Sequence, residues 1–122
     1  ELQMKRNLTY MFVTHDLSVV RHISDDICVM YLGQVVELSP AKELFKNPVH
    51  PYTKALLSAI PSVDIHNKMK REILKGEITS PIDPKPGCRF AARCRYATEA
   101  CSNRQELKEI SPGHFVSCCL VK

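Results

Sequence analysis

Cysteine is concentrated in the last part of this chain, and that concentration restricts the fold more than any other feature. Five of the six cysteines lie within residues 88–122. A chain without a secretory leader seldom uses so many thiols for disulfides, and no basic, then apolar leader opens this sequence. We therefore expect most of these thiols to bind a metal. The five residues are Cys88, Cys94, Cys101, Cys118 and Cys119.

The cysteine spacing favours an iron–sulfur cluster over zinc. The gaps between the first four of these cysteines are five, six and sixteen residues. Zinc sites prefer cysteine pairs two to four residues apart, whereas a four-iron cluster accepts longer loops between its ligands, although the spacing differs from the compact ferredoxin run. Disulfides and plain buried thiols remain further alternatives. Four nearby arginines either offset the negative charge of a cluster or form a solvated basic face: Arg89, Arg93, Arg95 and Arg104.

The fourth ligand is open on spacing alone. Cys118 and Cys119 are neighbours, and neighbours in an extended chain face opposite sides, so we expect only one of them to bind. His114 is either a ligand or a surface residue that follows a Ser-Pro-Gly turn. Cys28 lies in a predicted strand and is interpreted as a small buried apolar residue.

Residues 1–47 have the pattern of an α/β layer. Residues 8–14 form an apolar, β-branched run, which predicts a strand buried on both faces of a parallel sheet. Asp16 then predicts the cap of a helix over residues 17–23, with Leu17, Val20 and Ile23 on its apolar face. A hairpin over residues 27–31 and 34–38, turning at Leu32-Gly33, and a helix starting at Pro40 behind Ser39 complete the layer.

Residues 48–87 indicate a junction. A helix over Thr53–Ile60 is expected to stop at Pro61, because proline cannot continue a helix. From Ser62 to Gly87 the apolar density falls and prolines accumulate, which predicts an extended tether. Within the tether, Ile73-Leu74, Glu77 and Ile78 are compatible with either a short strand or a helical turn.

His15 is the candidate catalytic residue in the first segment. It directly follows the predicted strand of residues 8–14, at the carboxyl end where open α/β sheets bind ligands, although a structural or surface role fits a lone histidine as well. The chain has no G-x-x-x-x-G-K-[ST] loop, so we expect no nucleotide hydrolysis by this chain alone. The net charge of +4 from 17 basic and 13 acidic residues is too weakly clustered to predict nucleic-acid binding.

Three groups of segments resemble one protein family. Residues 12–17 with 29–37 resemble the switch-histidine segment and following strands of ABC transporter ATPase subunits. Residues 47–57 with Ile60-Pro61 are similar to the His-Pro-Tyr extension of the ATP-binding subunits of oligopeptide and dipeptide importers, a group that includes some nickel importers. The cysteine-containing segments from Gly87 onward resemble that family's C-terminal module, in which a four-iron, four-sulfur cluster is bound.

The resemblance implies roles for particular residues. It makes His15 the histidine that contacts the γ-phosphate of ATP and helps to position the attacking water at a dimer interface. It assigns the cluster to Cys88, Cys94, Cys101 and Cys118, with zinc as the alternative metal. Cys118 is preferred over Cys119 because it stands four residues after His114 in the matching motif.

The resemblance also implies an architecture and partners. Residues 1–47 correspond to the C-terminal portion of a P-loop ABC ATPase sheet, 48–87 to the His-Pro-Tyr helix and tether, and 88–122 to a small loop-rich cysteine module. The full-length subunit would use ATP and Mg²⁺ at the cytoplasmic face of the membrane, together with a second ATPase subunit, the transmembrane permease subunits and, indirectly, a peptide-binding protein.

Two further expectations concern the chain by itself. Because the phosphate loop, the signature segment and the catalytic acidic residue are missing, we expect the isolated chain to be inactive and to self-associate through unpaired strand edges. The alternative function is that of a stand-alone metal-binding interaction module, in which a metal folds a segment that is poor in apolar residues.

Overall fold

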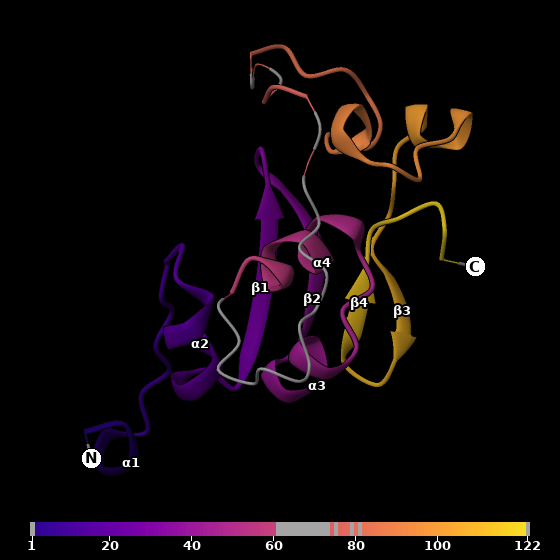
Figure 1. The fold of residues 1–122 in the computed structure, drawn as a ribbon. Coiled ribbons are helices and arrows are strands. Elements are labelled where there is room, and N and C mark those ends of the chain that lie inside the picture. The colour runs from indigo at the N-terminus through magenta and orange to yellow at the C-terminus, as the bar shows by residue number, and fades with distance from the viewer. Residues whose placement is uncertain (1, 61–73, 75, 79, 81, 122) are drawn as a thin grey trace, which may run out of the picture.

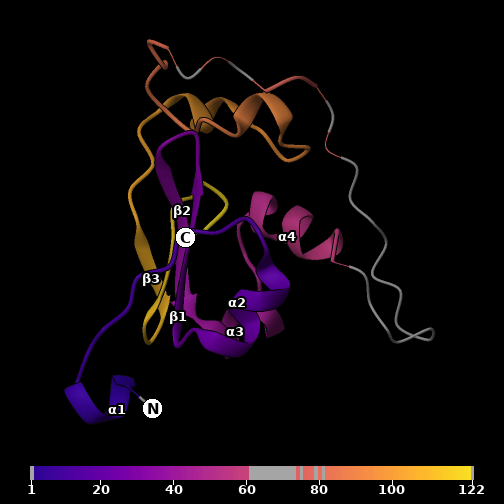
Figure 2. The same ribbon diagram turned by 90° about the vertical axis from the view of Figure 1, so that its left-hand side faces the viewer.

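The computed structural model describes residues 2–60, 74, 76–78, 80 and 82–121. It contains one antiparallel sheet with the strand order β1-β2-β4-β3, and its larger helices lie against one face of that sheet (Figures 1 and 2). The helices are α1 (Leu2–Arg6), α2 (Leu17–Ile23), α3 (Ala41–Lys46) and α4 (Pro51–Ser58), with the 3₁₀ turns η1 (Ala91–Arg93) and η2 (Glu99–Ser102). The strands are β1 (Asp26–Tyr31), β2 (Gln34–Pro40), β3 (Lys108–Ser111) and β4 (His114–Val116).

The predicted hairpin is confirmed as β1 and β2. Leu32 and Gly33 both have positive φ, at 46° and 79°, which is the backbone of the tight turn that matches the twist of paired strands. Along β1, Ile27, Val29 and Tyr31 are buried while the alternate residues are exposed. Cys28 belongs to the exposed set, so its prediction as a buried residue is wrong, because alternate side chains of a strand face opposite sides.

Strands from the cysteine-rich segment extend this hairpin. Glu37 and Leu38 of β2 pair with Val116 and Phe115 of β4, and β3 pairs with the other edge of β4. The sequence predicted residues 88–122 as loop-rich, and much of the segment is irregular, but its last part forms two strands of the same sheet. Val116 is fully buried there, so the apolar core of the sheet continues into β4.

Residues 8–14 form neither a strand nor a helix, so the predicted strand in a parallel sheet is wrong for this structure. The side chains of Met11 and Val13 are 90% and 94% exposed. A strand needs a neighbour that accepts its N–H groups and donates to its carbonyls, and the described sheet, which is antiparallel, offers no strand beside this segment. The apolar composition of the run therefore remains without a buried environment in the described chain.

The predicted helices form, α2 with the predicted bounds and α3 and α4 with shifted ends. Asp16 caps α2 by accepting the backbone N–H groups of Ser18 and Val19, as expected, but only Val20 of the predicted apolar face is buried and Ile23 is 53% exposed. Helix α3 starts at Ala41, one residue later than expected, because Ser39 still belongs to β2 and Pro40 occupies the cap. Helix α4 begins at Pro51 and ends at Ser58, two residues early at each end.

The core lies between the sheet and α3 and continues beneath the cysteine-rich segment. Leu44 and Phe90 are almost fully buried, and the ring of Phe90 lies 5.2 Å from that of Tyr31 and 5.3 Å from that of Tyr52 between centroids. Most of the predicted tether, including Ile73, falls outside the described residues. Leu74, Glu77 and Ile78, which are described, lie outside any helix or strand. Within the described ranges, none of the helices has the length and apolar character needed to span a bilayer.

Candidate functional site

His15 lies at the start of α2. It is exposed and immediately precedes the cap residue Asp16, whose backbone N–H donates to Thr14 Oγ1 at 3.1 Å. Figure 1 shows α2 near one end of the sheet, whereas η1 and η2 lie beyond the opposite end, past the turn of the β1–β2 hairpin. The structure therefore separates the candidate catalytic histidine from the candidate metal ligands.

The cysteines occupy a series of tight turns. The carbonyls of Cys88, Cys94 and Cys118 each accept a backbone N–H from three residues further along, at 3.1, 3.2 and 3.2 Å. The N–H of Cys88 also donates to the carbonyl of Cys101 at 2.8 Å, which joins two of these turns. The Sγ of Cys101 accepts the backbone N–H of Thr98 at 3.4 Å, and the backbone N–H groups of Phe90 and Leu120 act to lower the pKa of Cys88 and Cys118, respectively. Such N–H groups stabilise negative charge on a thiolate.

The thiols lie close enough to influence one another. Burial raises the pKa of the Cys88 thiol, and the thiols of Cys101, Cys118 and Cys94 raise that pKa further. Burial also raises the pKa of Cys118, with added contributions from Cys94 and Cys101. The thiols of Cys88, Cys94, Cys101 and Cys118 are therefore near enough to interact electrostatically.

Cys119 joins the same group. Its Sγ lies 3.2 Å from Cys101 Sγ, although the sequence predicted that two neighbouring cysteines would face opposite sides. That expectation assumed an extended backbone, whereas residues 118–121 form a turn closed by the bond from Val121 N to Cys118 O. The turn places Cys119 Sγ beside Cys101 Sγ.

The described cysteine side chains differ in arrangement from a site for a single metal ion. Among the described residues, no set of three or more His, Cys, Asp or Glu side chains has the arrangement that holds a single metal ion. A tetrahedral zinc with bonds of about 2.3 Å to sulfur would hold its thiolate sulfurs about 3.8 Å apart. The sulfurs of Cys101 and Cys119 lie closer together than this, at 3.2 Å. The donor set itself consists of cysteine sulfurs, the soft ligands that an iron–sulfur cluster uses.

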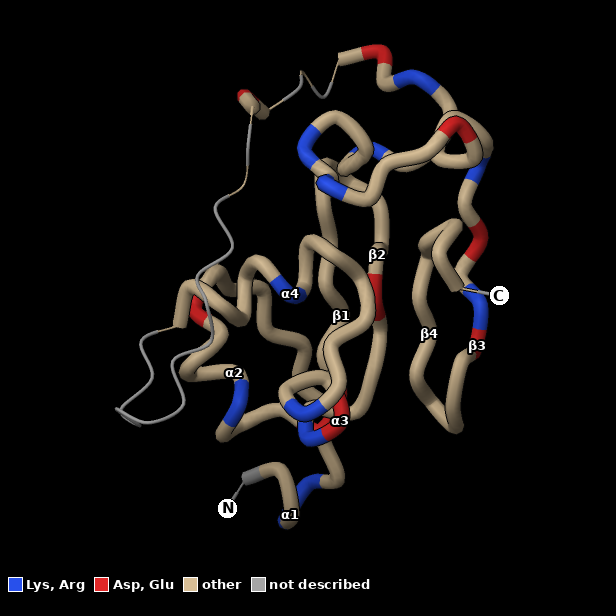
Figure 3. The backbone as a smooth tube through the Cα atoms, turned by 45° about the vertical axis from the view of Figure 1, so that its right-hand side comes forward, with Lys and Arg blue, Asp and Glu red and all other residues tan. Residues whose placement is uncertain are grey.

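The side chain of Gln34 holds the first cysteine turn on the hairpin. Its amide nitrogen donates to the carbonyl of Gly87 at 3.2 Å and its amide oxygen accepts the N–H of Arg89 at 3.2 Å. The Arg89 guanidinium in turn donates to the carbonyl of Leu32. Of the other arginines in this region, which Figure 3 draws in blue, Arg95 and Arg104 are exposed. Arg89 therefore positions Cys88 relative to the hairpin turn.

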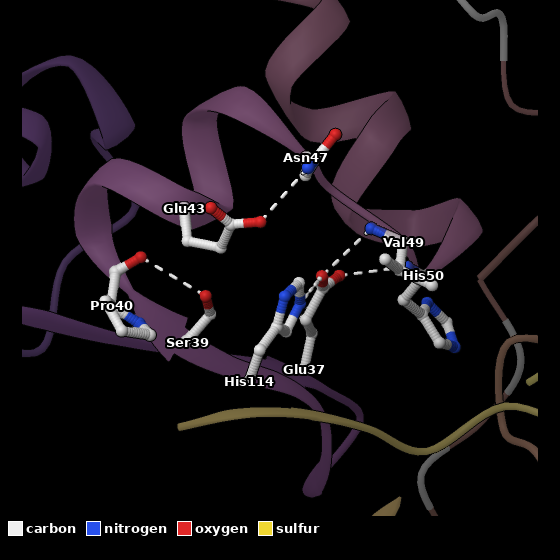
Figure 4. A network of polar contacts seen from close by, with 8 residues as sticks. All are labelled: Glu37, Ser39, Pro40, Glu43, Asn47, Val49, His50 and His114. Carbon is white, nitrogen blue, oxygen red and sulfur yellow. Dashed lines mark hydrogen bonds and ion pairs between the residues drawn. The ribbon is translucent and has the colours of Figure 1, made fainter. Parts of the chain in front are cut away.

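A buried carboxylate connects three separate parts of the chain (Figure 4). Glu37 of β2 is completely buried, and its Oε1 accepts the N–H of Val49 at 2.9 Å and contacts His114 Nε2 of β4 at 2.7 Å. Its Oε2 accepts the N–H of His50 at 2.9 Å. His114 is 1% exposed, so its prediction as a surface residue is wrong, and its Nε2 bonds Glu37 rather than facing a thiol.

His50 is the cap of α4. Its Nδ1 accepts the N–H of Tyr52 at 3.1 Å, and its ring is 1% exposed and packs 5.8 Å from that of Phe90. Burial lowers the pKa of His50 from 6.5 to about 4, and the negative charge of Glu37 opposes this only in part. Sequence reasoning missed both Glu37 and His50. The available signals were an acidic residue inside an apolar strand and a proline directly after a histidine.

We expect the stability of the chain to fall as the pH drops from about 6.5 to about 4. Unfolded His50 binds a proton at its ordinary pKa, whereas the buried ring resists protonation until about pH 4. The resulting loss reaches about 3 kcal/mol at 1.36 kcal/mol per pH unit. Urea unfolding at several pH values measures it. His50→Asn, which keeps a cap acceptor, should flatten this slope, and the exposed control His22→Asn should not; an unchanged slope in His50→Asn would contradict the assignment.

Similarity to known proteins identifies the family of this chain. The profile described as "Oligopeptide/dipeptide transporter, C-terminal region" matches residues 36–101, which include Glu37, His50 and the first three clustered cysteines. The chain is 53% identical over 98% of its length to the oligopeptide transport ATP-binding protein AppF of Bacillus subtilis, and 46% identical over 97% to the dipeptide transport ATP-binding protein DppF of Haemophilus influenzae.

The aligned region covers only part of these relatives. The chain spans 37% of the length of AppF and 36% of the length of DppF. The family model describes a C-terminal region. In this chain that region contains a hairpin, the helices that pack on it and several cysteines. The chain belongs to the oligopeptide/dipeptide transporter C-terminal-region family.

Proposed function

We propose that this chain forms the C-terminal part of an ATP-hydrolysing subunit that powers the uptake of oligopeptides or dipeptides by an ABC importer. The observation that carries the proposal is the family match over residues 36–101. The two relatives described above, which are ATP-binding proteins for oligopeptide and dipeptide transport, support it. The full-length subunit binds ATP and Mg²⁺, and this segment contributes the residues that follow the phosphate-binding part.

His15 is the residue of this chain that acts on ATP. It is exposed and stands immediately before the first turn of α2, so its imidazole is accessible to a nucleotide bound between two subunits. An imidazole at that position donates a hydrogen bond to the γ-phosphate, where negative charge develops during phosphoryl transfer, and orients the attacking water. We expect the isolated chain to be inactive because its sequence contains no phosphate-binding loop.

The proposal defines the partners and location of the full-length subunit. It pairs with a second ATPase subunit, docks on the transmembrane permease subunits at the cytoplasmic face of the membrane, and receives peptide indirectly from a binding protein. The exposed apolar segment of residues 8–13 supports self-association of the isolated chain, because unpaired apolar strand formers readily add to another copy.

A chimera tests the role of His15. The chain replaces the matching C-terminal region of AppF, and oligopeptide uptake is measured in cells that lack their own AppF. We expect uptake with the unmodified chimera, and His15→Ala should reduce it about a hundredfold, as for the loss of one transition-state donor. His22→Ala, which removes an exposed histidine within α2, should preserve uptake. Equal uptake by the two variants would exclude the role of His15.

We further propose that Cys88, Cys94, Cys101 and Cys118 hold a four-iron, four-sulfur cluster, with zinc as the alternative metal. The electrostatic effect of these thiols on one another and the Thr98 N–H that donates to Cys101 Sγ at 3.4 Å support the cluster. When bound, the cluster supplies covalent links between the turns that carry these cysteines. The pairing of β4 with β2 favours an integrated segment over a stand-alone metal-binding module.

Metal analysis after anaerobic purification tests the cluster. We expect broad absorption near 400 nm with about four irons and four sulfides per chain. Cys94→Ser should lose the colour, because it removes one ligand, whereas Cys28→Ser on the exposed face of β1 should retain it. About one zinc per chain and no colour would replace the cluster by the zinc alternative.

A further inference from the structure

Cys119 contacts Cys101 although it is not one of the four cysteines proposed to bind the cluster. Its Sγ lies 3.2 Å from Cys101 Sγ, although the two are eighteen positions apart in sequence. Both thiols are held by Thr98: its backbone N–H donates to Cys101 Sγ at 3.4 Å, and its Oγ1 lies 3.7 Å from Cys119 Sγ and 4.0 Å from Cys101 Sγ. The pair is therefore positioned by η2, which carries Cys101, and by the turn that follows β4.

We propose that Cys101 and Cys119 form a disulfide when the chain meets hydrogen peroxide without a bound metal. A disulfide bond of about 2.05 Å requires the two sulfurs to approach by only about 1 Å from their present separation. Formation of the bond does not depend on the proposed cluster. Its regulatory consequence does rest on the proposed function, because Cys101 is one of the four proposed cluster ligands.

The exposure of the two thiols sets the order of the reaction. Cys119 is partly exposed, whereas Cys101 is 7% exposed, so peroxide reaches Cys119 first. The Cys119 thiolate attacks one peroxide oxygen, the O–O bond breaks, and water leaves after protonation, which gives a sulfenic acid. The Cys101 thiolate then attacks the oxidised sulfur, the S–S bond forms, and a second water leaves. Overall, two thiols and one H₂O₂ give one disulfide and two waters.

The disulfide and the cluster exclude each other. A sulfur bonded to Cys119 Sγ is no longer a thiolate that can bind iron, so oxidation removes one ligand. The same bond protects Cys101 from irreversible oxidation to a sulfinic acid, and a cellular dithiol restores it. When the metal is lost under oxidative conditions, the Cys101–Cys119 disulfide therefore keeps Cys101 in a form that can be reduced again.

Peptide mapping tests the thiol pair on the whole chain. The metal-free, reduced protein is treated with one equivalent of hydrogen peroxide, the remaining thiols are alkylated, and linked peptides are identified by mass spectrometry. We expect the peptide that joins Cys101 to Cys119 to exceed every other disulfide about tenfold, since proximity decides which thiol reacts. Predominance of Cys101–Cys118 links, or an even mixture of pairings, would overturn the proposal.

Two serine variants complete the test. Cys119→Ser should leave Cys101 unlinked and shift it toward the sulfinic acid at higher peroxide, whereas Cys28→Ser should behave as the unmodified chain. Circular dichroism of both reduced variants confirms that each is folded before oxidation. If Cys119→Ser still traps Cys101 in a disulfide with Cys118 at the same yield, Cys119 has no special role and the proposal fails.

Reconstitution with iron and sulfide separates this proposal from the cluster. A loaded chain should resist formation of the Cys101–Cys119 link, and its Cys119 should remain open to alkylation. If no cluster forms but the link appears in the metal-free chain, the cluster proposal fails and the thiol pair stands. If Cys119→Ser cannot be loaded while Cys118→Ser can, Cys119 is itself a ligand and the thiol-pair proposal is overturned.

Discussion

Glu37→Gln is expected to lower the free energy of unfolding by about 3 kcal/mol, since it removes a buried charged acceptor. The carboxylate accepts the N–H groups of Val49 and His50 and contacts His114 Nε2, all within 2.9 Å. Glutamine has almost the same shape but only one acceptor oxygen. Its NH₂ group must then face at least one of these donors in a site that excludes water, so a buried donor is left without a partner.

Glu43→Gln provides the matched control. Glu43 lies on α3, and its Oε1 accepts the exposed side-chain amide of Asn47 at 3.1 Å, so its replacement should change stability by less than about 0.5 kcal/mol. Urea unfolding of the two variants and the unmodified chain at neutral pH measures the difference. Equal midpoints for Glu37→Gln and Glu43→Gln would show that the carboxylate does not hold β2, the segment before α4 and β4 together.

Glu37 also explains why the His-Pro-Tyr segment follows a strand with an internal acid. The residue sits at the centre of β2, where its neighbour Val36 is 3% exposed, and an isolated charge there would be strongly destabilising. The loop before α4 supplies two backbone donors and β4 supplies a histidine. The cysteine-rich segment is thus attached to the rest of the fold by a polar network as well as by strand pairing.

Local signals in the sequence predicted the local elements. The Leu32-Gly33 turn and the Asp16 cap each depend on a few adjacent residues, and both form as expected. The predicted ends of α3 and α4 were less accurate than those of α2. Helix α4 begins at Pro51 and not at the predicted Thr53, because its capping acceptor is a histidine rather than a Ser, Thr, Asp or Asn.

Long-range features could not be predicted in the same way. The apolar run of residues 8–14 has the composition of a strand, but strand formation depends on a partner, and the described chain supplies none. The pairing of β4 with β2 joins residues far apart in sequence, and no short pattern specifies it. Most of the residues predicted to form the tether are not among those that the structure describes.

The candidate site was predictable in composition and not in geometry. Thiols have few roles in a chain of this kind, so their density alone identified the cysteine-rich segment. The turn at Cys118–Val121, which brings Cys119 to Cys101, depends on one backbone hydrogen bond that spacing does not reveal. Gln34 was likewise missed, because a glutamine beside a hairpin turn is normally solvated.

Gly87→Ala should destabilise the chain by about 4 kcal/mol, since a strained backbone and a lost hydrogen bond add to a steric clash. Gly87 has a φ of +107°, which side chains rarely tolerate. A Cβ at this position would lie 2.4 Å from the carbonyl oxygen of Cys101 and 2.7 Å from that of Ser102. Both are backbone atoms, so the η2 segment must move and break the bond between Cys88 N and Cys101 O.

Gly113→Ala separates the clash from the strain. Gly113 also has a positive φ, at +74°, but the nearest atom to an added Cβ is Pro40 Cγ at 3.7 Å, which is ordinary contact. Its replacement should therefore cost only about 1 kcal/mol, the strain of the backbone alone. Urea unfolding gives both values, and the rate at which a thiol reagent modifies the reduced chain shows whether the cysteines have separated. Similar losses for both variants, with unchanged thiol reactivity, would contradict the close packing of Gly87 against the Cys101 turn.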